Sequence, residues 1–418
     1  MRRLLSAIIF FFFFTIAAAL AGGTVGSPAL ASSVHRSTVK ASLHRSSGAK
    51  AKHPKRYVVR KRAKDKPALR RSSIAQPTQT ATKATVSVPR LRFGIYPWAG
   101  AGTVNAAQAP KPDDPAQAMS AVRALQGSRS FTVHIYGQYT GADSAEADAL
   151  VSDAKWWSDS GLRVEMVLRY RPARPELAAG YVPWVATVAT RLAALPGLLA
   201  LQIGNEANNT ASAAAGDGAY PGAVDAIAHA IPVARQALVA AGRADVRVGL
   251  NWAAGSSPCT TEPMWSALRQ AGGSAFIAAV GWVGVDVYPG TWSAPAQTTY
   301  PTTAAINATV ADSLRCLRTR HMAAAGLGSS VTITVAETGY PTDADRSEST
   351  QASVLRATIA SVQSVSRQYG VTDLRWFDLR DANTGSGQLE NGYGLLRDDY
   401  TPKPAFAAFQ QIIAAQGA

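Results

Sequence analysis

Cysteine and histidine are scarce in this chain of 418 residues, which contains two cysteines and six histidines. With the nearby acids they never form the spacing of a zinc site, and three of the histidines fall within the first 53 residues. A P-loop and a G-x-S-x-G nucleophile turn are also missing from the sequence. We therefore expect no metal, no organic cofactor and no serine-hydrolase chemistry.

Acidic residues are almost absent from the first 90 positions, where Asp65 stands alone. Residues 32–90 carry 16 lysines and arginines, whereas residues 91–418 carry 24 basic and 26 acidic residues, so the overall charge of +15 belongs to a short stretch. That stretch is rich in Ser, Thr and Ala and has almost no aromatic residue beyond Tyr57. Because it cannot bury enough apolar surface to offset its ordering entropy, we predict a disordered basic linker over residues 32–90.

The charge of this linker first suggests a nucleic-acid partner, but the aromatic residues that usually alternate with such charges are missing. We therefore expect no nucleic-acid binding. Outside a cell, a polycation meets anionic cell-wall polymers or lipid head groups. A solvated tether without a specific partner is the open alternative.

Long apolar runs are absent except at the N-terminus. Arg2 and Arg3 precede an apolar run over residues 4–20, and residues 29–31 (Ala-Leu-Ala) offer a small-x-small cleavage site. We predict a signal peptide over residues 1–31 and a secreted, extracellular protein that is held at the cell wall. An uncleaved membrane anchor is the alternative, because the run is almost long enough to span a bilayer.

The two cysteines fit an exported protein. A disulfide between Cys259 and Cys316 would close a loop of about 57 residues and restrict the unfolded chain. Two free buried thiols are the alternative.

From residue 91 onward, short apolar runs rich in β-branched residues alternate with amphipathic helical stretches. The expected strands are 92–96, 130–136, 163–168, 198–204, 246–251, 279–287, 330–336 and 373–377. The expected helices are 116–125, 144–160, 182–194, 224–241, 304–324, 349–369 and 404–415. Most of these strands lack the alternation of a half-exposed sheet, which indicates a parallel sheet covered by helices.

Eight such units over residues 91–418 predict one α/β domain, a (β/α)8 barrel, which we expect to be monomeric. A doubly wound open sheet is the structural alternative, but the junction after the first strand lacks the G-x-G-x-x-G spacing.

Two glutamates follow apolar strands of the predicted barrel. Glu206 follows the fourth strand and Glu337 follows the seventh. A closed barrel can bring them together at its mouth although 131 residues separate them. Two carboxylates about 5 Å apart suit retaining glycoside hydrolysis, in which one donates a proton and the other attacks the sugar. Mutual repulsion raises the pKa of one member, which then acts as the acid.

These residues resemble the signature of clan A of the glycoside hydrolases, the retaining barrel enzymes that include cellulases, mannanases, β-glucanases and β-xylosidases. The resemblance covers roughly residues 91–415. It implies an O-glycosyl hydrolase with Glu206 as acid/base and Glu337 as nucleophile. It further implies that Asn205 holds the sugar 2-hydroxyl, that Tyr288 hydrogen-bonds the nucleophile, and that Trp376 floors the sugar next to the scissile bond.

The chain departs from the endoglucanase type at two positions. Asp286 stands where those enzymes place a histidine, and the second strand offers His134 and Tyr136 in place of an arginine. We expect His134 to line the mouth, Asp286 to contact substrate or to make a structural hydrogen bond, and Trp98 to stack on a sugar ring. The departures leave the family within the clan open.

The sequence thus predicts a secreted retaining hydrolase of β-linked glycans with a carbohydrate substrate. A non-catalytic glycan-binding barrel, held at the wall by its basic linker, is the competing class.

Overall fold

The computed structural model describes residues 90–99, 109–141 and 144–418. The predicted signal peptide and all of the predicted linker except Arg90 lie outside these residues.

Eight parallel strands close into a barrel in chain order, so that β1 pairs with both β2 and β8. The strands are β1 (Arg92–Ile95), β2 (Phe131–Tyr139), β3 (Arg163–Tyr170), β4 (Leu198–Ile203), β5 (Arg247–Ala253), β6 (Trp282–Asp286), β7 (Thr332–Thr338) and β8 (Val371–Trp376). Closure through the β1–β8 pair, in which Ile95 lies opposite Trp376, confirms the predicted barrel and excludes the open sheet.

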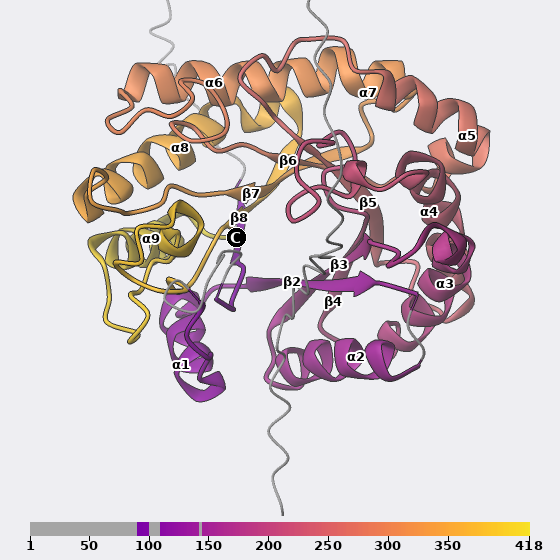
Figure 1. Cartoon of the computed structure of the whole chain (residues 1–418), viewed down its shortest axis with the longest axis horizontal. Helices are drawn as coiled ribbons and strands as arrows, with labels where there is room; N and C mark the ends of the chain where they lie inside the picture. The colour runs from indigo at the N-terminus through magenta and orange to yellow at the C-terminus, as the bar shows by residue number, and fades with distance from the viewer. Residues whose placement is uncertain (1–89, 100–108, 142–143) are drawn as a thin grey trace, which may run out of the picture. The chain divides into compact units, whose positions relative to one another are not determined.

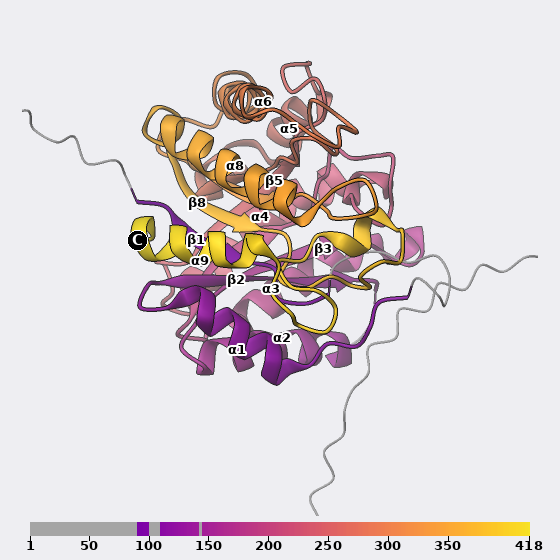
Figure 2. The ribbon, with the colours of Figure 1, turned by 90° about the vertical axis from the view of Figure 1, so that its left-hand side faces the viewer.

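Helices lie around the outside of the strands (Figure 1). They are α1 (Pro115–Gln126), α2 (Ser144–Asp159), α3 (Tyr181–Leu192), α4 (Ala223–Ala240), α5 (Pro263–Ala279), α6 (Thr303–Cys316), α7 (Met322–Ala324), α8 (Glu348–Tyr369) and α9 (Pro404–Gln416). Figure 2 shows α8 and α9 side by side on this outer layer. After α9, Gly417 bridges to Leu91 just before β1, at the end of the barrel opposite the mouth.

Two differences from the expected elements have local causes. Helix α5 was not expected, because Gly272 and Gly273 interrupt its pattern and Gly273 has a non-helical φ of 55°. The strand expected from residue 279 therefore begins only at Trp282. The expected helix 304–324 is α6, a π-helical turn over Leu317–His321, and the short α7.

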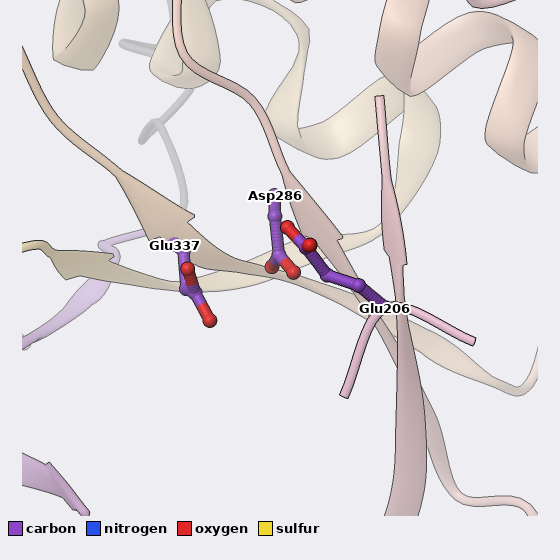
Figure 3. A group of neighbouring side chains, drawn as sticks. All are labelled: Glu206, Asp286 and Glu337. Carbon is purple, nitrogen blue, oxygen red and sulfur yellow. The ribbon is translucent and has the colours of Figure 1, made fainter. Parts of the chain in front are cut away.

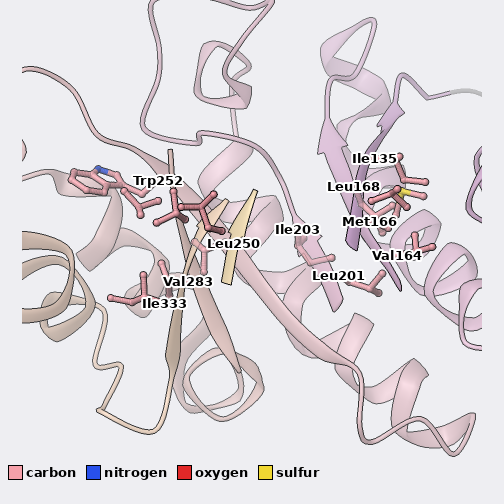
Figure 4. Close-up of a cluster of buried hydrophobic side chains, with 14 of the residues drawn as sticks. Ile135, Val164, Met166, Leu168, Leu201, Ile203, Leu250, Trp252, Val283 and Ile333 are labelled. Carbon is pink, nitrogen blue, oxygen red and sulfur yellow. The ribbon is translucent and has the colours of Figure 1, made fainter. Parts of the chain in front are cut away.

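Apolar side chains fill the layer between the strands and the helices. Figure 4 shows part of it, with Ile135, Met166, Leu201 and Val283 among its members. At the closing seam, Phe409 of α9 packs edge-on against Phe93, with ring centroids 5.7 Å apart. This layer anchors each strand, so the side chains at the strand ends have fixed positions.

The interior of the barrel contains buried charged side chains, unlike the outer layer. Arg375 on β8 reaches across to Glu165 on β3, with Nη2 to Oε2 at 3.0 Å, and also pairs with Asp373 at 3.0 Å. Burial opposes ionisation of Asp373, but Arg375 and Arg92 outweigh it and hold the pKa of this carboxyl well below its usual value. The buried charges are therefore paired, as such groups must be.

The structure joins Cys259, in the loop after β5, to Cys316 at the end of α6 in a disulfide, with Cα atoms 5.2 Å apart. His321 lies close by, where its Nε2 is 2.8 Å from the carbonyl oxygen of Pro258 and its ring stacks on Trp265. The disulfide and this histidine fasten the β5–α5 loop to the α6 side of the barrel.

Candidate active site

Three carboxylates meet at the carboxyl end of the barrel. Glu206 follows β4, Asp286 ends β6 and Glu337 lies on β7, and one oxygen of each lies within 4.8 Å of the others (Figure 3). The exposed fractions of the three residues are 8%, 2% and 7%. The barrel thus brings together the two glutamates singled out in the sequence and adds Asp286 beside them.

A tight turn after β4 presents Glu206. Gly204 has a φ of 75° and Glu206 a φ of 46°, a conformation that side-chain-bearing residues rarely adopt. Asp217 holds the turn, since its Oδ2 accepts the backbone N–H groups of Asn205 at 2.8 Å and of Tyr170 at 2.7 Å. Arg169 pairs with the other oxygen of Asp217 at 3.0 Å. The strained backbone is therefore fixed by a buried ion pair.

The environment of Glu206 suits a proton donor. Its backbone N–H donates to Asn251 Oδ1 at 2.7 Å, and its Oε2 accepts from Asn209 Nδ2 at 2.8 Å. Burial and then the negative charge of Glu337 raise the pKa of Glu206 to about 7. A carboxyl with this pKa is partly protonated near neutral pH and can give its proton to a leaving group.

Two tyrosines donate to Glu337. Tyr288 donates to Oε2 at 2.7 Å, and Tyr136 donates to Oε1. Burial and the neighbouring Glu337 charge raise the pKa of both phenols well above the usual value, so both keep their protons. Two hydrogen bonds to its oxygens hold the side chain of Glu337 in a fixed position, as a nucleophile requires.

Asp286 has one occupied and one open oxygen. Asn251 donates to its Oδ2, while its buried Oδ1 has no hydrogen-bond partner among the described residues. Burial, and then the charges of Glu337 and Glu206, raise the pKa of Asp286 well above its usual value. Burial and the neighbouring charges therefore favour the neutral form of Asp286. Within the described part of the chain, no hydrogen bond joins Asp286 to Tyr288, whose hydroxyl donates to Glu337.

Asn205 lies beside the carboxylates and is held firmly. Its Oδ1 accepts from Gln202 at 3.1 Å and from Asn251 at 2.8 Å, and its Nδ2 donates to the carbonyl oxygen of Ala215 at 3.0 Å. One proton of the Nδ2 group remains for a further acceptor.

Trp376, which is predicted from the sequence to lie under the sugar, does not line the barrel mouth. Trp376 is 1% exposed and packs in the outer apolar layer, because Asp373 and Arg375 point into the barrel and alternate residues of a strand point to opposite sides. Phe377, the next residue, has the inward direction and is half-buried. Its ring stacks on Tyr96 at 5.2 Å and meets Tyr288 edge-on at 6.4 Å. Phe377, directly after β8, is therefore the aromatic residue that this strand brings to the mouth.

Trp98 does not join the carboxylates either. Its ring lies against Trp156 and Trp157 of α2, with centroids 6.0 and 5.3 Å away, and its Nε1 donates to Asp153 at 3.2 Å. The indole thus joins the end of β1 to α2. Trp98 therefore packs against a helix and does not stack on a sugar ring.

His134 lies one layer below the mouth. Its Nε2 is 3.0 Å from the hydroxyl of Tyr136, and its Nδ1 is 2.8 Å from Glu165 Oε1. It reaches Glu337 only through Tyr136. Sequence reasoning did not assign a role to Tyr136 and Glu165; their signal was the alternation of polar and apolar residues along β2 and β3, which places Tyr136, His134 and Glu165 on the inner side.

Among the described residues, Glu206, Asp286 and Glu337 also form the group whose atoms are close enough to hold a metal ion. Each of them, however, already accepts a hydrogen bond from an asparagine or a tyrosine. The cluster is built as hydrogen-bonded carboxyl groups, which suits proton transfer and nucleophilic attack.

No protein-family model and no curated protein sequence matches this chain. Solved structures do resemble it. The GH5_18 from Streptomyces cattleya in complex with GlcNAc matches with a TM-score of 0.54 and 16% identity, covering 79% of this chain and 81% of that one. The GH5_18 from Bifidobacterium longum subsp. longum in complex with Manb1-4GlcNAc matches with 0.53 and 12%, covering 78% of each.

A family 1 β-glucosidase from Thermotoga maritima matches with a TM-score of 0.52 and 11% identity, covering 72% of this chain and 86% of that one. At such identities the likeness concerns the fold. The chain therefore has the (β/α)8-barrel fold of the clan A glycoside hydrolases.

Proposed function

We propose that this protein is a retaining glycoside hydrolase that cleaves β-O-glycosidic bonds of an oligosaccharide or polysaccharide by a two-glutamate double displacement. The observation that carries the proposal is the approach of Glu206 and Glu337, whose nearest carboxylate oxygens lie within 4.8 Å at the barrel mouth. Retaining enzymes separate their two carboxyl groups by about 5–5.5 Å, whereas inverting enzymes leave about 6.5–9.5 Å for a water.

In the first step, a Glu337 oxygen attacks the anomeric carbon while Glu206 gives its proton to the departing oxygen. The bond between this oxygen and the sugar breaks, and an ester between Glu337 and the sugar forms. The hydroxyls of Tyr136 and Tyr288 hold Glu337 in place, and the pKa of Glu206, raised to about 7, keeps its proton available.

In the second step, the Glu206 carboxylate takes a proton from water. The water oxygen attacks the anomeric carbon, and Glu337 leaves as a carboxylate. Two inversions restore the β configuration. Phe377 supports the sugar face, the free N–H of Asn205 is available to a hydroxyl, and the open oxygen of Asp286 offers a further polar contact.

The test uses the purified full-length chain with a panel of β-glucans, β-mannans and aryl β-glycosides. The panel includes glucosides, mannosides and N-acetylglucosaminides, because the resembling structures are a β-glucosidase and two GH5_18 proteins in complex with Manb1-4GlcNAc and with GlcNAc. Cleavage of any member by the wild-type protein supports the proposal. Binding without cleavage would instead support a non-catalytic glycan-binding barrel.

Variants of the two glutamates sharpen this test. Glu337→Gln should lower kcat by several orders of magnitude, because an amide does not attack the sugar. Glu206→Gln should spare aryl glycosides with good leaving groups, which depart without a proton. Glu176→Gln is the matched control, since this exposed glutamate pairs with Arg174 at 3.4 Å on the surface. Wild-type rates in both active-site variants would refute the assignment.

Secretion and retention at the cell wall complete the proposal. They rest on the apolar run after Arg3, the small-x-small site at residues 29–31 and the basic composition of residues 32–90. Anionic wall polymers are the proposed partner of this stretch.

A further inference from the structure

A line of polar contacts continues below Glu337 into the barrel. The hydroxyl of Tyr136 donates to Glu337 Oε1 and lies 3.0 Å from Nε2 of His134. Nδ1 of His134 lies 2.8 Å from Oε1 of Glu165. His134 is 1% exposed and Glu165 is fully buried, so water does not replace the contact between these two residues.

The line requires a definite number of protons. It contains three contacts, and each needs one proton between its two atoms. An ionised Glu165, a neutral His134, a phenolic Tyr136 and an ionised Glu337 supply two, one from the imidazole and one from the phenol. A third proton is therefore needed, and it resides on Glu165, His134 or Glu337.

Glu165 is held in its ionised form. Its Oε2 accepts from Arg375 Nη2 at 3.0 Å, and the same guanidinium group pairs with Asp373. Burial opposes ionisation of Glu165, but the charge of Arg375, and then the hydrogen bond from His134, lower the pKa of this carboxyl. The third proton is thus not on Glu165.

Glu337 must be ionised in order to attack a sugar, and its oxygens accept from two tyrosine hydroxyls. Other groups around the line do not take the proton. Tyr96 meets Tyr136 edge-on at 5.3 Å, and burial raises its pKa far enough to keep it a phenol. His134 remains as the carrier of the third proton.

We propose that His134 is a positioning residue that carries two ring protons and thereby turns the hydroxyl of Tyr136 towards Glu337. The inference rests on the proposed function, because that function requires an ionised Glu337. With a neutral His134 that accepts at Nε2, Tyr136 would donate to the imidazole, and Glu337 would keep Tyr288 as its single tyrosine donor.

The first test reads the protonation state directly and needs no activity. In the full-length protein labelled with ¹⁵N-histidine, both ring nitrogens of His134 should show a bonded proton at neutral pH. The signal is assigned by its loss in His134→Gln. If that variant does not fold, the signal is assigned by elimination, with glutamine variants of the other five histidines, at positions 35, 44, 53, 229 and 321. A ring nitrogen without a proton would overturn the inference, whether or not the protein cleaves glycosides.

The second test separates positioning from mere support of the fold. Tyr136→Phe and His134→Gln should each lower kcat about tenfold or more while KM changes little, because both residues act on Glu337. Since His134 acts through Tyr136, the double variant should be no slower than Tyr136→Phe alone. Losses that multiply in the double variant would overturn the inference. An inactive wild-type protein with a doubly protonated His134 would refute the proposed function alone.

Discussion

At the scale of single residues, Glu206 combines function with a cost in stability. Burial and the charge of Glu337 raise its pKa to about 7. The folded chain therefore binds this proton more tightly than the unfolded chain, where the pKa is near 4.5. The stability that goes with the bound proton is complete below pH 4.5 and is lost as the pH rises through 7.

Glu206→Gln should accordingly raise the melting temperature at pH 8, where the wild type must bury a charge beside Glu337, and change it little at pH 4. Thermal unfolding followed by circular dichroism at both pH values checks this. The exposed Glu176→Gln serves as control. An equal shift at both pH values would contradict the proposed origin of the raised pKa.

The same pKa predicts the pH dependence of turnover. Because Glu206 must be protonated to assist a poor leaving group, kcat/KM for such a substrate should fall as the pH rises through about 7. For Glu206→Gln acting on a glycoside with a good leaving group, that alkaline fall should disappear. Initial rates between pH 5 and pH 9 test the assignment, which fails if the fall persists in the variant.

Neighbouring aromatic residues on β8 should have different effects. Phe377→Ala removes a ring from the mouth and should lower kcat/KM about tenfold. This loss corresponds to about 1.4 kcal/mol of transition-state stabilisation. Trp376→Phe removes volume from the buried outer layer and should cost about 1–3 kcal/mol of unfolding free energy with kcat/KM nearly unchanged. Steady-state kinetics and urea unfolding of both variants test this. A larger kinetic loss in Trp376→Phe than in Phe377→Ala would contradict the prediction.

At the scale of structural elements, the turn after β4 depends on Asp217. This fully buried residue accepts two backbone N–H groups and pairs with Arg169. Asp217→Asn replaces one of the two accepting oxygens with an NH2 group, which donates. The change should therefore lower the free energy of unfolding by about 3–5 kcal/mol, and it should lower kcat by displacing Glu206.

The matched control for this change is Asp148→Asn. Asp148 is largely exposed on α2 and pairs with Arg191 at 2.6 Å, so its loss should cost about 1 kcal/mol at most. Urea unfolding and kcat are measured for both. Equal effects in the two variants would show that the β4 turn does not depend on Asp217.

Elements were predictable from sequence where the apolar period was clear. All eight strands and most helices followed from it, whereas α5 did not, because paired glycines break its pattern. The direction of individual side chains was harder to derive. Polar and apolar residues do alternate along β2 and β3, with Tyr136, His134 and Glu165 on the inner side. Continuous apolar runs are predicted there from the sequence instead. Alternation along β8 likewise directs Phe377 to the mouth, whereas Trp376 is predicted there from the sequence.

At the scale of the whole molecule, closure of the barrel explains why Glu206 and Glu337 could be found from sequence. Residues at the carboxyl ends of parallel strands converge whatever their separation along the chain. Contacts across the interior, such as that of Tyr136 with Glu337, depend on the strand register of the closed barrel. One sequence read alone does not specify that register.

The basic stretch belongs to the same scale, and its role is still a prediction. Deletion of residues 32–90, with the signal peptide kept, should reduce retention of the protein on an anionic cell wall and leave turnover of a small soluble glycoside unchanged. Co-sedimentation with wall material at low and high salt checks the first part, because charge attraction weakens with salt. A loss of turnover would place the domain boundary before residue 91.

The central claim is that Glu206 and Glu337 hydrolyse β-glycosides with retention. The most direct measurement follows a cleaved substrate by ¹H NMR during the first minutes, before the free sugar interconverts between its anomers. The account predicts that the first sugar released is the β anomer, since two displacements at the anomeric carbon restore its configuration. Release of the α anomer would contradict it, because a single displacement by water needs carboxyl groups farther apart than these.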